Sequence, residues 1–306
     1  MRVGVIDIGS NTTRVLIADA DKRGSVSELD RRSAVTRLGE GVDKNRRLSK
    51  TAIGRVRKVL DEYVQAMRQA GVEANVAVLT SAVRDSENGE ELVASLREDY
   101  GLDARILTGD QEAQLTFLGA MSGRSGEDQR HTLVIDVGGG STELILGAPG
   151  HVDFHVSLQL GVVRQTERHI DQDPPSEGDL RALKRDVRTL IERDVPARMR
   201  QGVQLAIAVA GTATSLAAID QALEPYDRSL VQGHEIDLPT ARLLLARLAC
   251  VPLAERREIR GLHPDRAPTI VAGTMILIEI LEAFGLDGFE VSENDILIGA
   301  AILLVR

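Results

Sequence analysis

The chain has 306 residues, of which 43% are hydrophobic, and a formal net charge of −9 at pH 7. This length is sufficient for two domains that each bury a core, and the acidic balance argues against a general nucleic-acid-binding protein. Aromatic residues make up only 2% and tryptophan is absent, so aliphatic side chains must build the core and an aromatic platform for single-stranded nucleic acid is disfavoured.

Cysteine content and the N-terminus bear on the location of the protein. Cys250 is the only cysteine and lies in the apolar run LLLARLACVPL, so we expect a buried thiol, no disulfide framework and a reducing compartment. The N-terminus MRVGVIDIGSN lacks the apolar stretch of a signal peptide, and no charge-free run approaches the length of a membrane span. We therefore expect a cytoplasmic protein without a membrane or nucleic-acid partner.

The chain up to Met121 predicts an α/β domain from its hydrophobic periodicity. The expected elements are strands at 2–10 and 13–21, a helix at 49–71, a strand at 75–85, a helix at 89–101, a strand at 104–109 and a helix at 110–121. The next segment, SGRSGEDQR at 122–130, is rich in glycine, serine and charged residues, as linkers are. We therefore expect one domain at residues 1–124 and a second at 125–306.

The second part of the chain predicts another α/β domain. Its expected elements are a strand pair around DVGGGST, a helix at 178–195, a strand at 204–211, helices at 213–223, 238–250 and 267–285, and a strand and a final apolar helix within 287–306. We expect the final helix to pack against the first domain or against a second subunit.

An internal repeat relates the two halves. DIGSNTTRVLIA from Asp7 aligns without a gap with DVGGGSTELILG from Asp136, and each copy predicts a strand, a tight polar turn and a strand. Glycines let the backbone approach a ligand, and clustered N–H groups in such turns bind anions. Two such turns facing across a cleft would grip one phosphate chain, with a divalent cation on their carboxylates. Two ordinary hairpins are the alternative, which a single copy would favour.

A basic strip interrupts this acidic protein between Arg31 and Lys50. It contains Arg31, Arg32, Lys44, Arg46 and Arg47, together with Arg37, against only two acids. Such a strip is typical of a track for a polyanion, and equally of a solvated loop before a helix. Both interpretations stay open at this point.

Seven motifs follow one another over nearly the whole chain: DIGSN at Asp7, RLGEGV at Arg37, TSAVRD at Thr80, TGDQEA at Thr108, DVGGGSTE at Asp136, AGTATS at Ala210 and GLHPDRAPTIVAG at Gly261. In this order they resemble the exopolyphosphatase/guanosine pentaphosphate phosphohydrolase (Ppx/GppA phosphatase) family, a branch of the actin-like, sugar kinase and Hsp70 superfamily. The resemblance implies an α/β fold of two ribonuclease-H-like domains of the actin-like ATPase superfamily with a cleft between them.

The resemblance also implies hydrolysis of the terminal phosphoanhydride of a polyphosphate or a nucleotide polyphosphate. Our first hypothesis is an exopolyphosphatase, which removes orthophosphate from the end of inorganic polyphosphate by metal-dependent hydrolysis, because the basic strip favours a long anion. Glu112 would be the general base that activates water, and Arg84 would clamp phosphate oxygens. Magnesium, with manganese as the alternative, would be held by Asp7, Asp136 and Glu143. The phosphate chain would be cradled by Ser10, Asn11, Thr12, Gly138, Gly139, Gly140, Ser141 and Thr142.

Plainer interpretations compete with these two catalytic roles. We expect Glu112 in the first turn of a helix after an Asp110 cap, where acids commonly only complement the helix dipole. Arg84, expected at a strand end, could pair with Asp85 or Glu87 on the surface instead. The motif context favours catalysis in both cases.

Three other functions stay open beside the exopolyphosphatase. Hydrolysis of the 5′ γ-phosphate of pppGpp would need a purine pocket, and few aromatic residues are available to stack a guanine. A sugar-kinase-like phosphotransferase and a non-enzymatic alarmone sensor are both disfavoured by Glu112, which suits attack by water. The expected partners are polyphosphate, guanosine or adenosine nucleotides as substrate or regulator, and a second copy in a homodimer.

Overall fold

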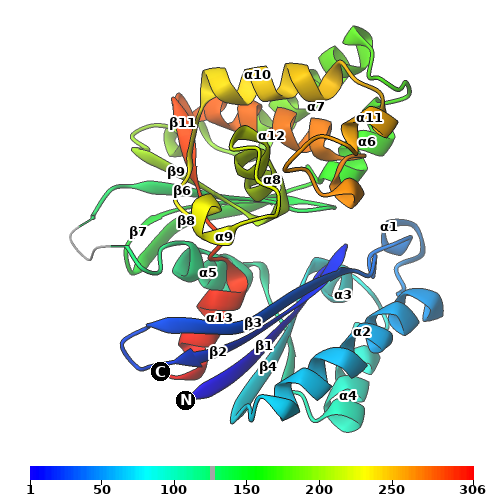
Figure 1. Ribbon diagram of the computed structural model, residues 1–306, viewed down its shortest axis with the longest axis vertical. Helices are drawn as coiled ribbons and strands as arrows, with labels where there is room; N and C mark the ends of the chain where they lie inside the picture. Colours follow the sequence, from blue (N-terminus) through cyan, green and yellow to red (C-terminus); the bar gives the residue numbers. More distant parts are fainter. Residues whose placement is uncertain (125–127) are drawn as a thin grey trace. The chain divides into compact units, whose positions relative to one another are not determined.

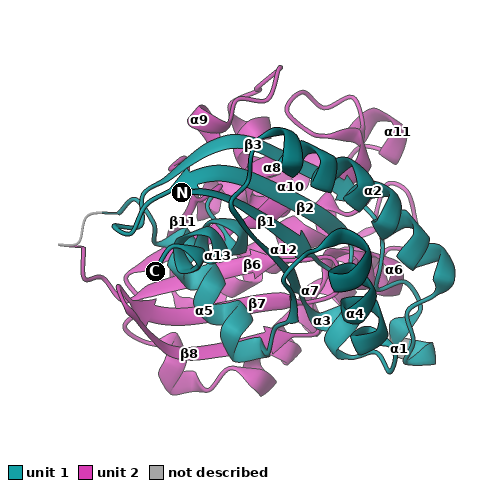
Figure 2. Cartoon of the chain, turned by 90° about the horizontal axis from the view of Figure 1, so that it is seen from below, with its two compact units in different colours: residues 1–124, 294–306 teal, residues 125–293 magenta. Residues whose placement is uncertain are grey.

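The computed structural model describes residues 1–124 and 128–306, and the chain forms two compact units. Unit 1 comprises residues 1–124 and 294–306, and unit 2 comprises residues 125–293 (Figure 2). The boundary predicted at residue 125 falls on residues 125–127, which lie outside the described residues. Each unit contains one mixed β-sheet with helices, so the predicted α/β class with two domains is confirmed.

Unit 1 has a five-stranded sheet in the order β3-β2-β1-β4-β5 (Figure 1). Its strands are β1 (Arg2–Ile8), β2 (Thr12–Ala20), β3 (Val26–Val35), β4 (Ala74–Leu79) and β5 (Ala104–Ile106). The first three strands pair antiparallel, whereas β4 pairs parallel with β1 and β5 parallel with β4.

Helices cover both faces of this sheet (Figure 1). They are α1 (Val42–Asn45), α2 (Lys50–Gln69), α3 (Ser81–Arg84), α4 (Gly89–Tyr100), α5 (Gly109–Ala120) and α13 (Ile296–Leu304). Side chains alternate between the two faces of a strand, so Ile6 and Ile8 of β1 pack with α2 and α4. Val3 and Val5 of the same strand pack with α13 and α5 on the other face. The final helix is therefore part of the core of unit 1.

Unit 2 has a six-stranded sheet in the order β10-β11-β9-β6-β7-β8. Its strands are β6 (Thr132–Val137), β7 (Thr142–Ala148), β8 (His151–Leu158), β9 (Leu205–Val209), β10 (Glu235–Asp237) and β11 (Gly288–Val291). Its α-helices are α6 (Val162–His169), α7 (Glu177–Asp194), α8 (Ala210–Asp220), α9 (Arg228–Val231), α10 (Leu238–Ala249), α11 (Leu253–Arg256) and α12 (Ile270–Phe284). Short 3-10 helices lie at Ala197–Arg200 and Pro264–Arg266. Almost every side chain of α12 is buried, because this helix packs against α6, α7, α8 and α10.

The predicted repeat is confirmed as a pair of matching hairpins. In each unit the first strand pairs antiparallel with the second and parallel with a later strand. The turns close in the same way: the Gly9 N–H donates to the Thr12 carbonyl at 3.0 Å, and the Gly138 N–H donates to the Ser141 carbonyl at 2.9 Å. The two copies therefore close their turns with the same backbone hydrogen bond between equivalent residues.

Several expectations for local structure were wrong. The strand expected at 75–85 ends at Leu79, and α3 follows, since the Thr80 carbonyl accepts the N–H groups of Val83 and Arg84. β3 was not expected, because it is an edge strand with mostly exposed side chains and hence no apolar alternation. Cys250 is exposed, contrary to the expected buried thiol. It lies two residues after the buried Leu248, which places it about 200° around the helix axis from that side chain.

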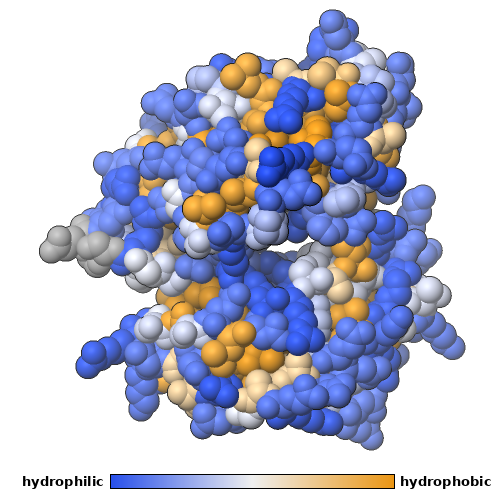
Figure 3. All heavy atoms as spheres, in the orientation of Figure 1, coloured by the Kyte–Doolittle hydropathy of each residue, from blue (hydrophilic) through white to orange (hydrophobic). Residues whose placement is uncertain are grey.

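The surface is mixed in polarity. On the face shown in Figure 3, hydrophobic residues form small groups among hydrophilic ones. Leu243 on α10 is the most exposed of the large hydrophobic side chains of the described residues, at 72%. Over residues 1–124 and 128–306, no helix is both long enough and apolar enough to cross a membrane.

Candidate active site

The first repeat turn, in unit 1, is held in place by the segment that follows β3. The Asn11 carbonyl accepts the N–H groups of Thr36 and Arg37 at 3.0 and 2.9 Å, and the Ser10 carbonyl accepts that of Gly39 at 2.8 Å. The Ser10 hydroxyl also lies 3.0 Å from the Ser81 hydroxyl. The RLGEGV motif thus serves here as a support for the DIGSN turn.

Asp7 lies at the end of β1 and is only 5% exposed. The Arg14 Nε and Nη2 atoms both donate to Asp7 Oδ2, at 3.0 and 2.6 Å, and Arg14 also bonds Asp295 through Nη1. Burial raises the pKa of the Asp7 carboxyl, and the pairing with Arg14 acts against that rise. The predicted metal ligand is therefore already paired with an arginine that sequence reasoning did not identify.

Glu112 and Arg84, the two predicted catalytic residues, meet in unit 1. Arg84 Nη1 donates to Glu112 Oε2 at 3.0 Å and to the Leu107 carbonyl at 2.9 Å. The surface pairing of Arg84 with Asp85 or Glu87 is not the arrangement observed. The pairing with Glu112 was outside the reach of the sequence pattern, because it joins α3 and α5.

The environment of Glu112 shifts the pKa of its carboxyl above the ordinary value. Burial raises the pKa of this carboxyl, Arg84 acts to lower it, and the negative charge of Asp7 adds to the rise. A carboxylate with a raised pKa is the stronger general base at neutral pH. The N-cap of α5 is Thr108, not Asp110: its hydroxyl accepts the Gln111 N–H, and the Gln111 side chain accepts the Thr108 N–H, which forms a capping box.

The second repeat turn, in unit 2, rests on the start of α6. The N–H groups of Val162 and Val163 donate to the carbonyls of Gly138 and Gly139 at 2.9 and 3.0 Å. Arg164 Nε donates to the Gly140 carbonyl at 3.2 Å. All three glycine carbonyls of the turn are therefore oriented toward α6.

This orientation decides where the amides of the turn point. Within a trans peptide the C=O and the following N–H point in opposite directions, so the amides of Gly139, Gly140 and Ser141 face away from α6. None of the three finds an acceptor among residues 1–124 and 128–306. Three consecutive unpaired donors form an anion-binding nest. Such a nest suits phosphate oxygens.

Asp136 and Glu143 face each other as register partners on β6 and β7 beside this turn. Glu143 Oε1 accepts the hydroxyls of Ser141 and Ser157, each at 2.7 Å. In the part of the chain that the structure describes, no cluster of three or more His, Cys, Asp or Glu side chains is arranged to hold a metal ion. Mg²⁺ commonly takes one or two carboxylates and completes its shell with water and substrate phosphates, so the oxygen ligands present fit that mode.

The basic strip divides into two groups in the structure. Arg31 and Arg32 lie on β3 and pair with acids of the same strand, Glu28 and Asp30. The other group, Lys44, Arg46 and Arg47, lies on and after α1, and all three side chains are exposed. Arg47 also lies 3.4 Å from Glu87. The second group is the more open to a polyanion.

Sequence reasoning missed Arg14, Gly161 and Asp295. The internal repeat could have indicated Arg14, because Arg14 aligns with Glu143. In the structure Arg14 is the register partner of Asp7, as Glu143 is of Asp136. No sequence pattern indicates a role for Gly161. Only the structure shows it, because a Cβ at this position would lie 2.2 Å from the Gly139 carbonyl oxygen.

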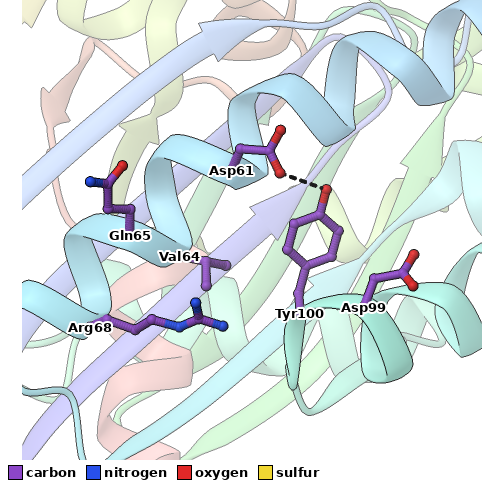
Figure 4. Close-up of a pocket in the computed structure, with 6 residues that line it drawn as sticks. All are labelled: Asp61, Val64, Gln65, Arg68, Asp99 and Tyr100. Carbon is purple, nitrogen blue, oxygen red and sulfur yellow. Dashed lines mark hydrogen bonds between the residues drawn. The ribbon is translucent and has the colours of Figure 1, made fainter.

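A shallow pocket in unit 1 lies elsewhere, between α2 and α4 (Figure 4). Its lining residues are Asp61, Val64, Gln65, Arg68, Asp99 and Tyr100. The Tyr100 hydroxyl donates to Asp61 at 3.0 Å, so two of its polar groups satisfy each other. No predicted site residue lines it, and we do not place the active site there.

Comparison with known proteins gives consistent matches over nearly the full length. Residues 16–296 match the model of the Ppx/GppA phosphatase family. Exopolyphosphatase 2 of Mycobacterium tuberculosis is 35% identical over 320 aligned positions, which cover 99% of this chain and 98% of that protein. Exopolyphosphatase 1 of Mycobacterium bovis is 31% identical over 293 positions, covering 95% and 84%. The crystal structure of the Aquifex aeolicus member of the Ppx/GppA family has a TM-score of 0.86 at 30% identity, covering 99% and 97%.

Proposed function

The chain belongs to the Ppx/GppA phosphatase family, and on this premise we propose that it is an exopolyphosphatase. It hydrolyses the terminal phosphoanhydride of inorganic polyphosphate and releases orthophosphate. The observation that carries the proposal is the three-amide nest at Gly139, Gly140 and Ser141, together with a partly buried carboxylate, Glu112, paired with an arginine.

We propose the following roles in the reaction. The amides of the nest donate to phosphate oxygens, and Ser10, Asn11 and Thr12 belong to the same binding set. Thr142 was also predicted for this set, but it is fully buried and its hydroxyl donates to the Leu160 carbonyl, so we assign it a role in supporting the turn. Glu112 accepts a proton from the attacking water as the new P–O bond forms, and the bridging oxygen departs with the shortened polyphosphate. Arg84 moves its hydrogen bonds from Glu112 toward the phosphate oxygens on which charge develops.

The proposed cation is Mg²⁺, with Mn²⁺ as the alternative. Asp7, Asp136 and Glu143 are its proposed ligands, directly or through water, because these carboxylates lie beside the two repeat turns. When bound, the ion would neutralise phosphate charge and so assist attack by water. The homodimer and the cytoplasmic location expected from the sequence stay predictions.

The test is a phosphate-release assay with Mg²⁺ on long polyphosphate, tripolyphosphate, ATP and pppGpp. We expect release from long polyphosphate to have the highest kcat/KM. Faster release from pppGpp would instead favour the nucleotide phosphohydrolase. No release from any of the four would contradict the proposal.

Glu112→Gln tests the catalytic role against the helix-dipole role. General-base catalysis commonly contributes about 10²- to 10⁴-fold, so we expect kcat to fall by at least about 100-fold with polyphosphate binding retained. The matched control is Glu90→Gln, which removes an exposed acid from the first turn of α4 in the same unit. Equal kcat values for the two variants would show that Glu112 only complements the dipole of its helix.

A further inference from the structure

Arg37, in the RLGEGV motif, has a backbone conformation that residues other than glycine rarely adopt. Its φ is +48°, in the left-handed region. A residue with a Cβ costs free energy in this region, and such residues persist only where the surrounding structure holds them, often at ligand-binding sites. Arg37 is thus present at a cost to the stability of unit 1.

Hydrogen bonds hold the backbone on both sides of Arg37. The Asn11 carbonyl accepts the N–H groups of Thr36 and Arg37 at 3.0 and 2.9 Å. The Arg37 carbonyl accepts hydrogen bonds from Arg55 Nη2 at 3.0 Å and from the Glu40 N–H at 3.2 Å. Both peptide groups of Arg37 are therefore fixed, and the first is bound directly to the first repeat turn.

The side chain of Arg37 is exposed, whereas its neighbours Thr36 and Leu38 are buried. Its guanidinium has no hydrogen-bond or ion-pair partner within residues 1–124 and 128–306. Arg47 of the same basic strip differs, because it pairs with Glu87. The N–H donors of the Arg37 guanidinium are thus available to an anion.

Arg37 lies along the chain between the first repeat turn and the exposed cations of α1. The segment continues from Arg37 to Gly39, whose N–H donates to the Ser10 carbonyl at 2.8 Å, and enters α1 at Val42. Gly39 approaches the turn so closely that a Cβ there would lie 3.0 Å from the Ser10 Cβ. A phosphate chain held at the turn therefore meets Arg37 before it reaches Lys44.

We propose that Arg37 is a specificity-determining residue that binds the phosphate group next to the one held at the first repeat turn. A linear chain of two or more phosphates offers this second group, whereas orthophosphate does not. The inference rests on the proposed function, since it takes Ser10 and Asn11 as phosphate-binding residues. A guanidinium suits the task because its planar fork of donors can bind two phosphate oxygens at once.

Arg37→Gln tests the proposal, because it removes the charge and keeps a polar side chain. Binding of tripolyphosphate is measured by isothermal titration calorimetry without divalent cations, so that metal-dependent hydrolysis does not consume the ligand. We expect Kd for tripolyphosphate to rise by about tenfold, since the lost hydrogen bonds are charge-assisted but exposed to screening. Kd for orthophosphate should change by less than about twofold, because orthophosphate has no second group for Arg37 to bind.

Chain length separates Arg37 from the cations of α1. Kd for long polyphosphate should rise in Arg37→Gln by the same factor as Kd for tripolyphosphate, because both ligands contain the phosphate that Arg37 binds. Replacing Arg46 and Arg47 with alanine should instead weaken the long chain more than tripolyphosphate.

Arg37→Gly separates binding from structure. Glycine adopts φ +48° without steric cost, so the urea midpoint should equal or exceed the parental value while Kd for tripolyphosphate rises as in Arg37→Gln. A lower urea midpoint with a parental Kd would assign Arg37 a structural role. Arg68→Gln is the matched control, since it removes an exposed arginine from the last turn of α2 and should leave Kd unchanged.

Two further results would overturn the inference: a parental Kd for tripolyphosphate in Arg37→Gln, or an equal rise in Kd for orthophosphate and tripolyphosphate. So would a parent protein that binds no tripolyphosphate, and the phosphate-release assay would then decide the proposed function separately. A protein whose Arg37 variants lost tripolyphosphate affinity as expected, but which released no phosphate with Mg²⁺, would contradict the proposed function and leave the role of Arg37 supported.

Discussion

Gly161 offers the sharpest test of the second repeat turn, because a single methyl group there would displace it. Gly161 is the N-cap of α6, with φ −90° and ψ 148°, a conformation that alanine adopts without strain. A Cβ at this position would lie 2.2 Å from the Gly139 carbonyl oxygen and from the Gly140 carbonyl carbon. Both neighbours are backbone atoms, so no side-chain rotation can relieve the overlap.

The size of the effect follows from these distances. Ordinary contact begins at 3.4 Å, so the turn or α6 must shift by 1.2 Å in Gly161→Ala. Overpacking of this kind costs about 1–3 kcal/mol, which is less than the roughly 5–15 kcal/mol that stabilises a typical protein. The variant should therefore fold. A displacement of about 1 Å in a binding group can lower the rate by about 100-fold, so we expect kcat/KM to fall by that factor.

The measurement is steady-state phosphate release from long polyphosphate with saturating Mg²⁺, alongside urea unfolding to confirm a folded enzyme. Gly178→Ala is the matched control in unit 2, since the nearest atom to its Cβ is the Ser176 hydroxyl oxygen at 3.5 Å, an ordinary contact. A folded Gly161→Ala enzyme with kcat/KM within about threefold of the parent would refute the reasoning.

Three further predictions concern unit 1. In Arg84→Met the pKa of Glu112 should rise further, because Arg84 opposes the effect of burial. The general base works in its deprotonated form, so the acid limb of the pH profile of kcat/KM should move to higher pH. An acid limb at the parental pH would contradict the pairing of Arg84 with Glu112. Replacing Arg46 and Arg47 with alanine should raise KM for long polyphosphate more than for tripolyphosphate and weaken its salt dependence, whereas equal losses would support the solvated-loop interpretation. Gly299→Ala would place a Cβ 1.9 Å from the Leu115 carbonyl oxygen and should lower the free energy of unfolding by about 1–3 kcal/mol, and an unchanged urea midpoint would contradict this packing.

The sequence by itself determined the features that depend on near neighbours. The strand–turn–strand repeat follows from glycines and hydroxyl residues placed at the same offsets after Asp7 and Asp136, because a tight turn is decided by the few residues within it. Most long helices follow in the same way, since α2 shows apolar residues at helical spacing and Gly71 after its end, with φ +70°. The family motifs then carried the function class.

The tertiary structure decided which distant side chains meet. Arg84 pairs with Glu112 only because α3 and the start of α5 come together. Arg14 lies 281 positions from Asp295, and their contact exists because α13 packs against the sheet of unit 1. The wrong prediction of a buried Cys250 has a related cause. An apolar run gives the composition of a segment but not the face of the helix on which each residue lies. Local patterns report torsional and periodic preferences of the backbone, whereas charge pairing and close packing depend on the positions of segments that only the folded chain brings together.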